Sequence, residues 1–339
     1  MTDTTSHAKP TRRTVLAAAL AMPAILALPR GAQAQAQISL TLGHNAAAGN
    51  PRWVAADKFG ELVKERTNGR IAVRVAGAEQ LGNEQSLLTS LRTGAVDMTV
   101  NSQGSTSALL PELAALGLPF LFDSSAAAFK VLDGAIGTEL DQRFNKIGMV
   151  SLGWWDNGIR DVTNSKRPIV KPADLKGLKI RTPPDPMTID IFQTLGASTE
   201  QISFGELYVA LQQGVVDGQE NPLVNIYSSK LYEVNKHISL TGHKWECSPF
   251  LMSQITWMRL SAADREVIKT AAKEAGDLQR KLFHDNQQKC AADFRANPKL
   301  EINEADKPAL RDACAKVYEI WKAKPFGDFV GRLVTAART

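Results

Sequence analysis

Residues 83–100 read NEQSLLTSLRTGAVDMTV, and this stretch changes its hydrophobic period halfway along. Leu87, Leu88 and Leu91 recur at helical spacing before Gly94, whereas the residues after Gly94 are typical of a β-strand. Asn83 is suited to cap the start of the helix and Gly94 to cap its end. The segment is therefore predicted to be a helix that leads directly into a strand.

The residues upstream continue the same alternation. ISLTLGH at 38–44 and RIAVRVAG at 70–77 are predicted to be strands, and PRWVAADKFGELVKERTNG at 51–69 is predicted to be the amphipathic helix between them. Strands that alternate with helices are typical of an open α/β layer with a largely parallel sheet. The fold class predicted from these patterns is α/β.

A second segment repeats the pattern of the first. LLTSLRTGAVD at 87–97 and LYVALQQGVVD at 207–217 both fit LxxxLxxGxVD, which combines an apolar helical face, a glycine cap and the start of a strand. The repeat predicts two similar α/β lobes. Two long helical patterns follow near the C-terminus, at 263–294 and 309–323.

The N-terminus has the features of an export signal. Arg12 and Arg13 precede an apolar run, and AQAQAQ at 32–37 supplies small residues spaced like a signal-peptidase site. Residues 1–36 are predicted to be a cleaved signal of twin-arginine type, with the general secretory route as the alternative. Pro23 and Pro29 interrupt the apolar run, which is too short for a membrane anchor.

Cleavage changes the charge of the protein. It removes four positive charges and one negative charge, so the net charge falls from +5 to +2. Because no Lys/Arg block remains, we expect no nucleic-acid partner. With 339 residues and 44% hydrophobic content the chain can bury a sizeable core, and its length favours about two domains.

The cysteines and histidines do not indicate a metal site. No zinc-type Cys/His cluster is present, and neither a metal nor a cofactor is expected. The three cysteines leave two alternatives in an oxidising compartment: a Cys290–Cys314 disulfide with Cys247 unpaired, or three buried thiols.

GLKIRTPP at 177–184 places one arginine between a short strand and two prolines. Pro183 and Pro184 cannot continue a sheet ladder, so Arg181 is predicted to be the last residue of its strand. Ligands of open α/β sheets bind beyond the carboxyl ends of the strands, and a guanidinium group suits a carboxylate. The alternatives are a surface charge or an ion pair with Asp185.

Longer motifs carry a resemblance to a known family. GIRDVTNSKRPIVKPADLKGLKIRTPP at 158–184 and GASTEQISFGELYVALQQGVVDGQENPL at 196–223 resemble the DctP-type solute-binding proteins of tripartite ATP-independent periplasmic (TRAP) transporters. LGHNAAAGNPRWVAADKFGELVKERTNGRIAVRV at 42–75, QLGNEQ at 80–85 and LGLPFLF at 116–122 extend the resemblance over nearly all of the chain after residue 36.

The resemblance implies a two-lobed periplasmic binding-protein clamshell, type II-like, with open mixed sheets, helices on both faces and long C-terminal helices that brace both lobes. Such a protein captures an organic acid and passes it to a membrane permease without chemistry on the ligand. A periplasmic monomer is expected. Lobe I is predicted to comprise 37–157 plus 248–286, and lobe II 158–247 plus 287–339, with crossovers near 156–160 and 245–249.

The resemblance also implies site residues. Arg181 stands at the position of the arginine that holds the ligand carboxylate through two bonds, and Arg160 at that of an assisting arginine. Asn221 matches an asparagine that reaches the carboxylate end, and Phe204 matches an aromatic residue of the pocket wall.

Glu84 follows the QLG motif, where some members of the family use an acid on ligand hydroxyls; it also suits the first turn of a helix, because it complements the helix dipole. His44 and Asn45 end the first strand, at the correct edge of the sheet. For His44 the alternative is a packed imidazole.

The remaining candidates are Trp155, Asp156, Asn225 and Trp245. Trp155 is a candidate to stack on a sugar ring, although core packing explains a tryptophan equally well. Asn225 lies one helical turn beyond Asn221, and Trp245 lies near the expected crossover.

An acid, amides and aromatic residues beside two arginines suit a sugar acid, either a uronate or an aldonate. A dicarboxylate or a keto or hydroxy acid is the alternative ligand. No GxSxG, HExxH, P-loop lysine or post-strand GxGxxG motif occurs, so an enzyme is not expected, although separated catalytic carboxylates would leave no such motif.

Overall fold

The computed structural model describes residues 37–339. The export signal predicted at 1–36, its cleavage and its export route therefore lie outside the described residues.

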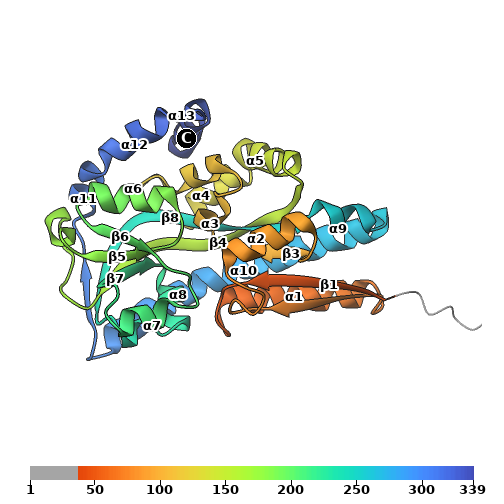
Figure 1. Cartoon of the computed structure of the whole chain (residues 1–339), viewed down its shortest axis with the longest axis horizontal. Helices are drawn as coiled ribbons and strands as arrows, with labels where there is room; N and C mark the ends of the chain where they lie inside the picture. Colours follow the sequence, from red (N-terminus) through yellow and green to blue (C-terminus); the bar gives the residue numbers. More distant parts are fainter. Residues whose placement is uncertain (1–36) are drawn as a thin grey trace, which may run out of the picture. The chain divides into compact units, whose positions relative to one another are not determined.

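The strands of residues 37–339 form one mixed sheet (Figure 1). Its order is β2-β1-β3-β8-β4-β7-β5-β6, with β9 paired to β8. The strands are β1 (Ile38–His44), β2 (Ile71–Ala76), β3 (Met98–Val100), β4 (Met149–Asn164), β5 (Lys179–Thr182), β6 (Ser198–Gln201), β7 (Gly218–Asn221), β8 (His237–Ser253) and β9 (Glu301–Glu304).

The sheet order has an internal symmetry that follows the sequence repeat. β1 lies between parallel neighbours β2 and β3, and β5 lies between parallel neighbours β6 and β7. β3 then pairs antiparallel with β8, and β7 pairs antiparallel with β4. The long strands β4 and β8 pair with each other and join the two halves. The prediction of two similar α/β lobes is confirmed at this level.

The repeated residues have the same local function in both halves. Gly94 and Gly214 end their helices with φ of 73° and 70°, in the left-handed region where glycine is favoured. Asp97 accepts a hydrogen bond from the backbone N–H of Thr41 (2.7 Å), and Asp217 accepts one from that of Lys179 (2.9 Å). Each aspartate thus fastens its strand to the central strand of its half.

The helices cover the sheet and carry the connections. The α-helices are α1 (Pro51–Arg66), α2 (Glu84–Thr93), α3 (Gln103–Thr106), α4 (Ser125–Leu132), α5 (Ala135–Lys146), α6 (Pro186–Thr194), α7 (Leu207–Gln212), α8 (Leu223–Ser228), α9 (Gln254–Arg259), α10 (Ala262–Ala296), α11 (Lys307–Ala313), α12 (Ala315–Lys322) and α13 (Gly327–Arg338). Short 3₁₀ helices lie at Pro111–Gly117, Pro172–Leu175 and Leu231–Glu233. Asn83 caps α2 as predicted, because its side chain accepts from Ser86 N at 3.0 Å.

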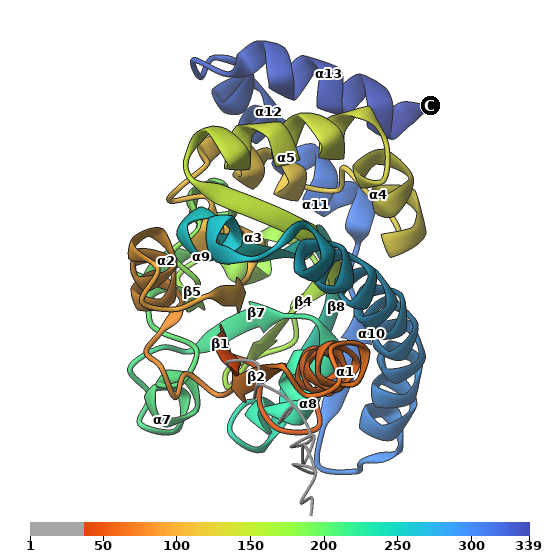
Figure 2. The same ribbon diagram turned by 90° about the vertical axis from the view of Figure 1, so that its right-hand side faces the viewer.

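Helix α10 braces the two halves of the sheet. Figure 2 shows it running beside α1 and on past β8. Ile268 and Ala275, in its first part, belong to the apolar core around β1 and β3, whereas Phe283 and Phe294 pack in the core around α7 and α8. The predicted bracing by a long C-terminal helix is confirmed. The second helical pattern, however, is divided at Cys314 into α11 and α12.

A third core cluster joins α4, α5, α6 and the C-terminal helices. It unites residues from 110–144, which the sequence assigns to lobe I, with residues from 169–197 and 310–334, which the sequence assigns to lobe II. The exact lobe boundaries therefore stay a prediction.

The cysteine alternatives are resolved in favour of thiols. Cys247, Cys290 and Cys314 are free and buried, and Cys290 and Cys314 lie in different core clusters. Among residues 37–339, no helix is long and apolar enough to cross a membrane. The same part of the chain contains no group of three His, Cys, Asp or Glu side chains that could hold a metal.

Candidate functional site

A cleft lies where β1, β3, β5, β6 and β7 end, which is where open α/β sheets bind ligands. It has two parts that share Glu84, Arg181 and Phe204. The inner hollow is lined also by Asn45, Ala46, Arg52, Ser102, Asn157, Arg160, Pro183, Asn221, Asn225 and Glu246. The outer hollow is lined also by Glu79, Asn83, Gln85, Ser105, Pro184, Gln201, Ile202 and Ser203.

Arg181 is the penultimate residue of β5, one position earlier in the strand than predicted, because Thr182 still pairs with β6. Its side chain is buried; Nε donates to the carbonyl of Ile202 at 2.8 Å, and the guanidinium lies 5.9 Å from the Phe204 ring centroid. Within residues 37–339, neither Nη atom has a hydrogen-bond acceptor or ion-pair partner. Burial lowers the pKa of Arg181 to about 10, against the opposing effect of Glu220. The fork of this cation is therefore available to a ligand.

The alternative ion pair of Arg181 with Asp185 is wrong. Asp185 caps α6 by accepting from Met187 N at 3.0 Å, and its other oxygen accepts from Lys244 Nζ at 2.5 Å. Asp185, the nearby carboxylate that could have paired with Arg181, is thus paired with Lys244, almost sixty positions further along the chain.

Arg160, on β4, differs from Arg181 because its guanidinium has carboxylate partners. Its guanidinium donates to the carboxylate and the carbonyl of Glu220, to Glu246 at 2.8 Å and to Asn221 Oδ1 at 3.2 Å. Burial acts to lower the pKa of Arg160, but Glu220 and Glu246 outweigh it, so the pKa is raised. Arg160 lines the inner hollow with its charge already compensated.

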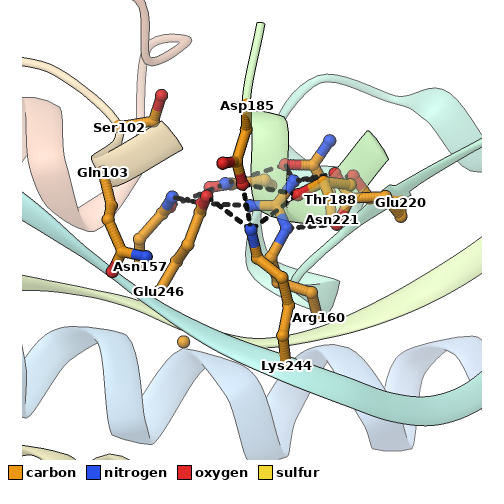
Figure 3. Close-up of polar contacts among 12 residues, drawn as sticks. Ser102, Gln103, Asn157, Arg160, Asp185, Thr188, Glu220, Asn221, Lys244 and Glu246 are labelled. Carbon is orange, nitrogen blue, oxygen red and sulfur yellow. Dashed lines mark hydrogen bonds and ion pairs between the residues drawn. The ribbon is translucent and has the colours of Figure 1, made fainter. Parts of the chain in front are cut away.

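A buried ionic network forms the wall behind the inner hollow (Figure 3). Lys244 Nζ lies 2.5 Å from Asp185, 2.6 Å from the Thr188 hydroxyl and 3.0 Å from Glu246. Glu246 also accepts from Arg160 and from Asn157 Nδ2, both at 2.8 Å. These side chains come from β4, β8 and the start of α6, so the network ties the long central strands to the half of the sheet that holds Arg181.

Glu84 lies in the first turn of α2 and also lines both hollows, so both of its sequence interpretations fit its position. One carboxylate oxygen accepts from Ser102 N at 2.5 Å, and the other accepts from the hydroxyls of Ser102 and Ser105, both at 2.6 Å. An ionised carboxylate has about four acceptor sites. Glu84 is therefore held in place and keeps capacity for one ligand donor.

The asparagines form a connected group in the inner hollow. Asn221 donates to Gln219 at 2.6 Å and accepts from Arg160, while Asn225 donates to Asn157 at 3.1 Å. Asn225 Oδ1 also accepts from Asn50 Nδ2 at 2.9 Å, which links α8 to the start of α1. The predicted candidates Asn45, Asn221 and Asn225 are thus brought together with Arg160, Arg181, Phe204 and Glu84.

The other four candidates lie outside the lining of the cleft. His44 is fully buried against Trp53, and burial lowers its pKa to about 3, so it is the packed neutral imidazole of the alternative interpretation. Trp245 packs edge-on to two phenylalanines and donates to Asp156 at 3.1 Å. Because side chains alternate along a strand, Trp245 faces away from the side on which Lys244 and Glu246 form the network.

Trp155 and Asp156 also differ from their predicted placement. Trp155 is fully buried, packs on Phe250 with ring centroids 5.2 Å apart, and contributes to the core around β1 and β3. Asp156 turns its carboxylate to the N–H of Gly158 at 2.8 Å and to Trp245. A break in the β4–β8 register after Asp156 leaves Asn157 as the residue that reaches the inner hollow.

Sequence reasoning missed Arg52, Asn157, Ser102 and Glu246. For two of these residues, Arg52 and Glu246, the sequence contains a pattern that could have identified them. A cation in the first turn of a helix opposes the helix dipole, and Arg52 occupies such a position in α1. Lys244 and Glu246 are separated by one residue in a strand and therefore lie on the same face, a pattern typical of paired charges.

The cleft lies between two similar sheet halves that are joined by long shared strands, and it is lined by a buried arginine whose Nη atoms have no acceptor among residues 37–339. These features define a ligand-binding protein of the clamshell class. The chain matches the family described as "Bacterial extracellular solute-binding protein, family 7" over residues 42–324. It belongs to this family, the DctP-type solute-binding proteins of TRAP transporters.

Similar proteins agree with this assignment. An uncharacterized protein, y4mM of Sinorhizobium fredii, is 63% identical over 91% of this chain, which spans 57% of that relative's length. The 2,3-diketo-L-gulonate-binding periplasmic protein YiaO of Escherichia coli is 36% identical over 81% of this chain and 84% of its own length. The solved structure of the sugar acid binding protein DctPAm from Advenella mimigardefordensis, in complex with galactonate, has 31% identity and a TM-score of 0.86; the match covers 89% of this chain and 98% of that one.

The family assignment confirms the predicted fold class of a two-lobed α/β clamshell. Members of the family are extracytoplasmic proteins that bind small organic acids and work with TRAP membrane components. The characterised relatives are solute-binding proteins, not enzymes.

Proposed function

We propose that this protein captures a hydroxylated monocarboxylate, a sugar acid of the uronate or aldonate class, and delivers it unchanged to its TRAP permease. The observation that carries the proposal is the fork of Arg181, which lines the cleft and whose two Nη atoms have no acceptor among residues 37–339. A buried cation without a partner is unfavourable, and an incoming carboxylate relieves that state through two charge-assisted hydrogen bonds.

The neighbours of Arg181 suit the carboxylate end of such a ligand. Asn221 lines the same hollow and is oriented by Gln219 and Arg160. Phe204 packs beside the guanidinium, where its ring excludes water from the ion pair. Arg160 acts as a positioning residue, because its own donors are directed to Glu220, Glu246 and Asn221.

The position of Glu84 favours a single carboxylate on the ligand. A second ligand carboxylate would meet Glu84 in the part shared by both hollows, where two like charges repel each other. A hydroxyl can instead donate to Glu84, which keeps one acceptor site. The galactonate complex of DctPAm and the binding of 2,3-diketo-L-gulonate by YiaO support the same ligand class.

Calorimetric titration of the purified protein with D-galactonate, D-glucuronate and succinate tests the proposal. We expect saturable binding of a sugar acid and weaker binding of succinate, with the sugar acid recovered unchanged by NMR. Preferential binding of succinate would replace the sugar acid with the dicarboxylate alternative. Turnover of the sugar acid would refute the transport role.

A further inference from the structure

Arg52 is a second buried arginine that has no carboxylate partner in the part of the chain that the structure describes. It is 4% exposed, and its guanidinium donates only to neutral acceptors: Asn45 at 2.6 Å, Asn157 at 3.0 Å and Ser248 at 2.6 Å. Two of its five N–H groups, Nε–H and one on Nη1, therefore have no acceptor within residues 37–339. Burial lowers the pKa of Arg52, although Glu84 and Glu246 act to raise it.

The local position of Arg52 is also unfavourable. It lies directly after Pro51 in the first turn of α1, where the helix dipole disfavours a positive charge. Neither helix stability nor ion pairing accounts for an arginine here. Besides contacting its three neutral acceptors, Arg52 lines the inner hollow together with Arg181 and Asn221.

Arg52 and Arg181, which have no carboxylate partner among residues 37–339, line this hollow from opposite halves of the sheet. Arg52 lies in the helix that follows β1, and Arg181 is the penultimate residue of β5, the symmetry-related strand of the other half. On the basis of the proposed function, we infer that Arg52 contacts the ligand and determines specificity. It donates to the oxygen on the carbon next to the carboxylate, and Arg181 holds that carboxylate. The site then selects 2-hydroxy and 2-oxo acids over acids that lack an oxygen at that carbon.

The position of the hollow supports this assignment to the C2 oxygen. The residues that receive the carboxylate line the inner hollow together with Arg52, whereas the outer hollow contains Glu79, Gln85, Gln201 and Ser203 for the rest of a polyhydroxy chain.

A double-mutant cycle between protein and ligand tests the inference. Arg52→Gln is titrated against D-galactonate and 2-deoxy-D-galactonate, with Arg92→Gln as the control, because Arg92 is exposed on α2 and lines neither hollow. Losing one charge-assisted hydrogen bond predicts that Arg52→Gln weakens galactonate binding roughly 10- to 150-fold. Binding of the 2-deoxy analogue should change less than about threefold, since no oxygen remains for Arg52 to contact. Arg52→Lys should recover part of the galactonate affinity.

The outcomes separate this inference from the proposed function. If wild-type protein binds no sugar acid, the proposed function fails. If wild-type protein binds galactonate but Arg52→Gln weakens both ligands equally, Arg52 only shapes the site and the inference is overturned. Unchanged galactonate binding by Arg52→Gln would overturn it as well.

Discussion

Replacing Arg181 by methionine separates ligand binding from folding, because this arginine is buried and has no anionic partner in the described part of the chain, residues 37–339. A bidentate contact to a carboxylate comprises two charge-assisted hydrogen bonds of about 1.5–3 kcal/mol each. Arg181→Met should therefore weaken sugar-acid binding by about 3–6 kcal/mol, or roughly 10²- to 10⁴-fold. Arg181→Lys should recover only part of this loss, because a point charge replaces the planar fork.

The same substitution should leave the unliganded fold intact. The lowered pKa of Arg181, about 10 instead of 12.5, means that burial disfavours the folded cation by roughly 3 kcal/mol. The hydrogen bond to Ile202 returns about 1 kcal/mol, and methionine fills most of the volume. We expect the free energy of unfolding without ligand to stay unchanged or to rise.

Two measurements test these predictions for Arg181→Met: isothermal titration with D-galactonate for the binding affinity, and urea unfolding without ligand for the stability. Arg92→Met is the control, since its side chain is exposed and lines neither hollow. Binding by Arg181→Met within about threefold of wild type would refute the assignment of Arg181 as the anchor. A loss of several kcal/mol in unliganded stability would refute the view that its cation is uncompensated.

Three further predictions concern stability. Burial raises the pKa of Asp161 to about 7, so the folded protein binds a proton that the unfolded chain releases between about pH 4 and 7, and stability should fall as pH rises through this window. Asp161→Asn, which can keep the acceptor for Gly242 N–H, should gain up to roughly 4 kcal/mol over wild type at pH 8 and little at pH 4; a difference that does not vary with pH would contradict this. Lys244→Met leaves Asp185 and Glu246 without their buried cation and should lower the free energy of unfolding in urea by about 3–5 kcal/mol, whereas a loss below about 1 kcal/mol would show that the ionic network is not formed. Because the three cysteines are free and buried, a reductant should leave the thermal midpoint unchanged, and a thiol reagent should react fully only after unfolding; a lowered midpoint would indicate a disulfide.

The local features of the fold were predictable from the sequence. The strand at 38–44, the cap at Asn83, the glycine stop at Gly94 and the repeated α2–β3 and α7–β7 units all appear in the structure. These features depend on hydrophobic period and backbone conformation over a few residues, and such information is local. The resemblance to the family in turn predicted that Arg181, Asn221 and Phe204 lie in one binding site.

The partners of the charged side chains were decided only by the tertiary structure. Arg160 is matched with Glu220 and Glu246, which follow it by 60 and 86 residues, and Asp185 is taken by Lys244. Trp155 and Trp245 enter the core instead of the cleft, and the register break in β4 after Asp156 leaves Asn157 at the inner hollow. The sequence by itself thus determined the elements, their order and the family, whereas the free charges of the site were set by long-range packing. Whether a buried arginine remains available to a ligand depends on which distant carboxylates the fold brings within hydrogen-bonding distance.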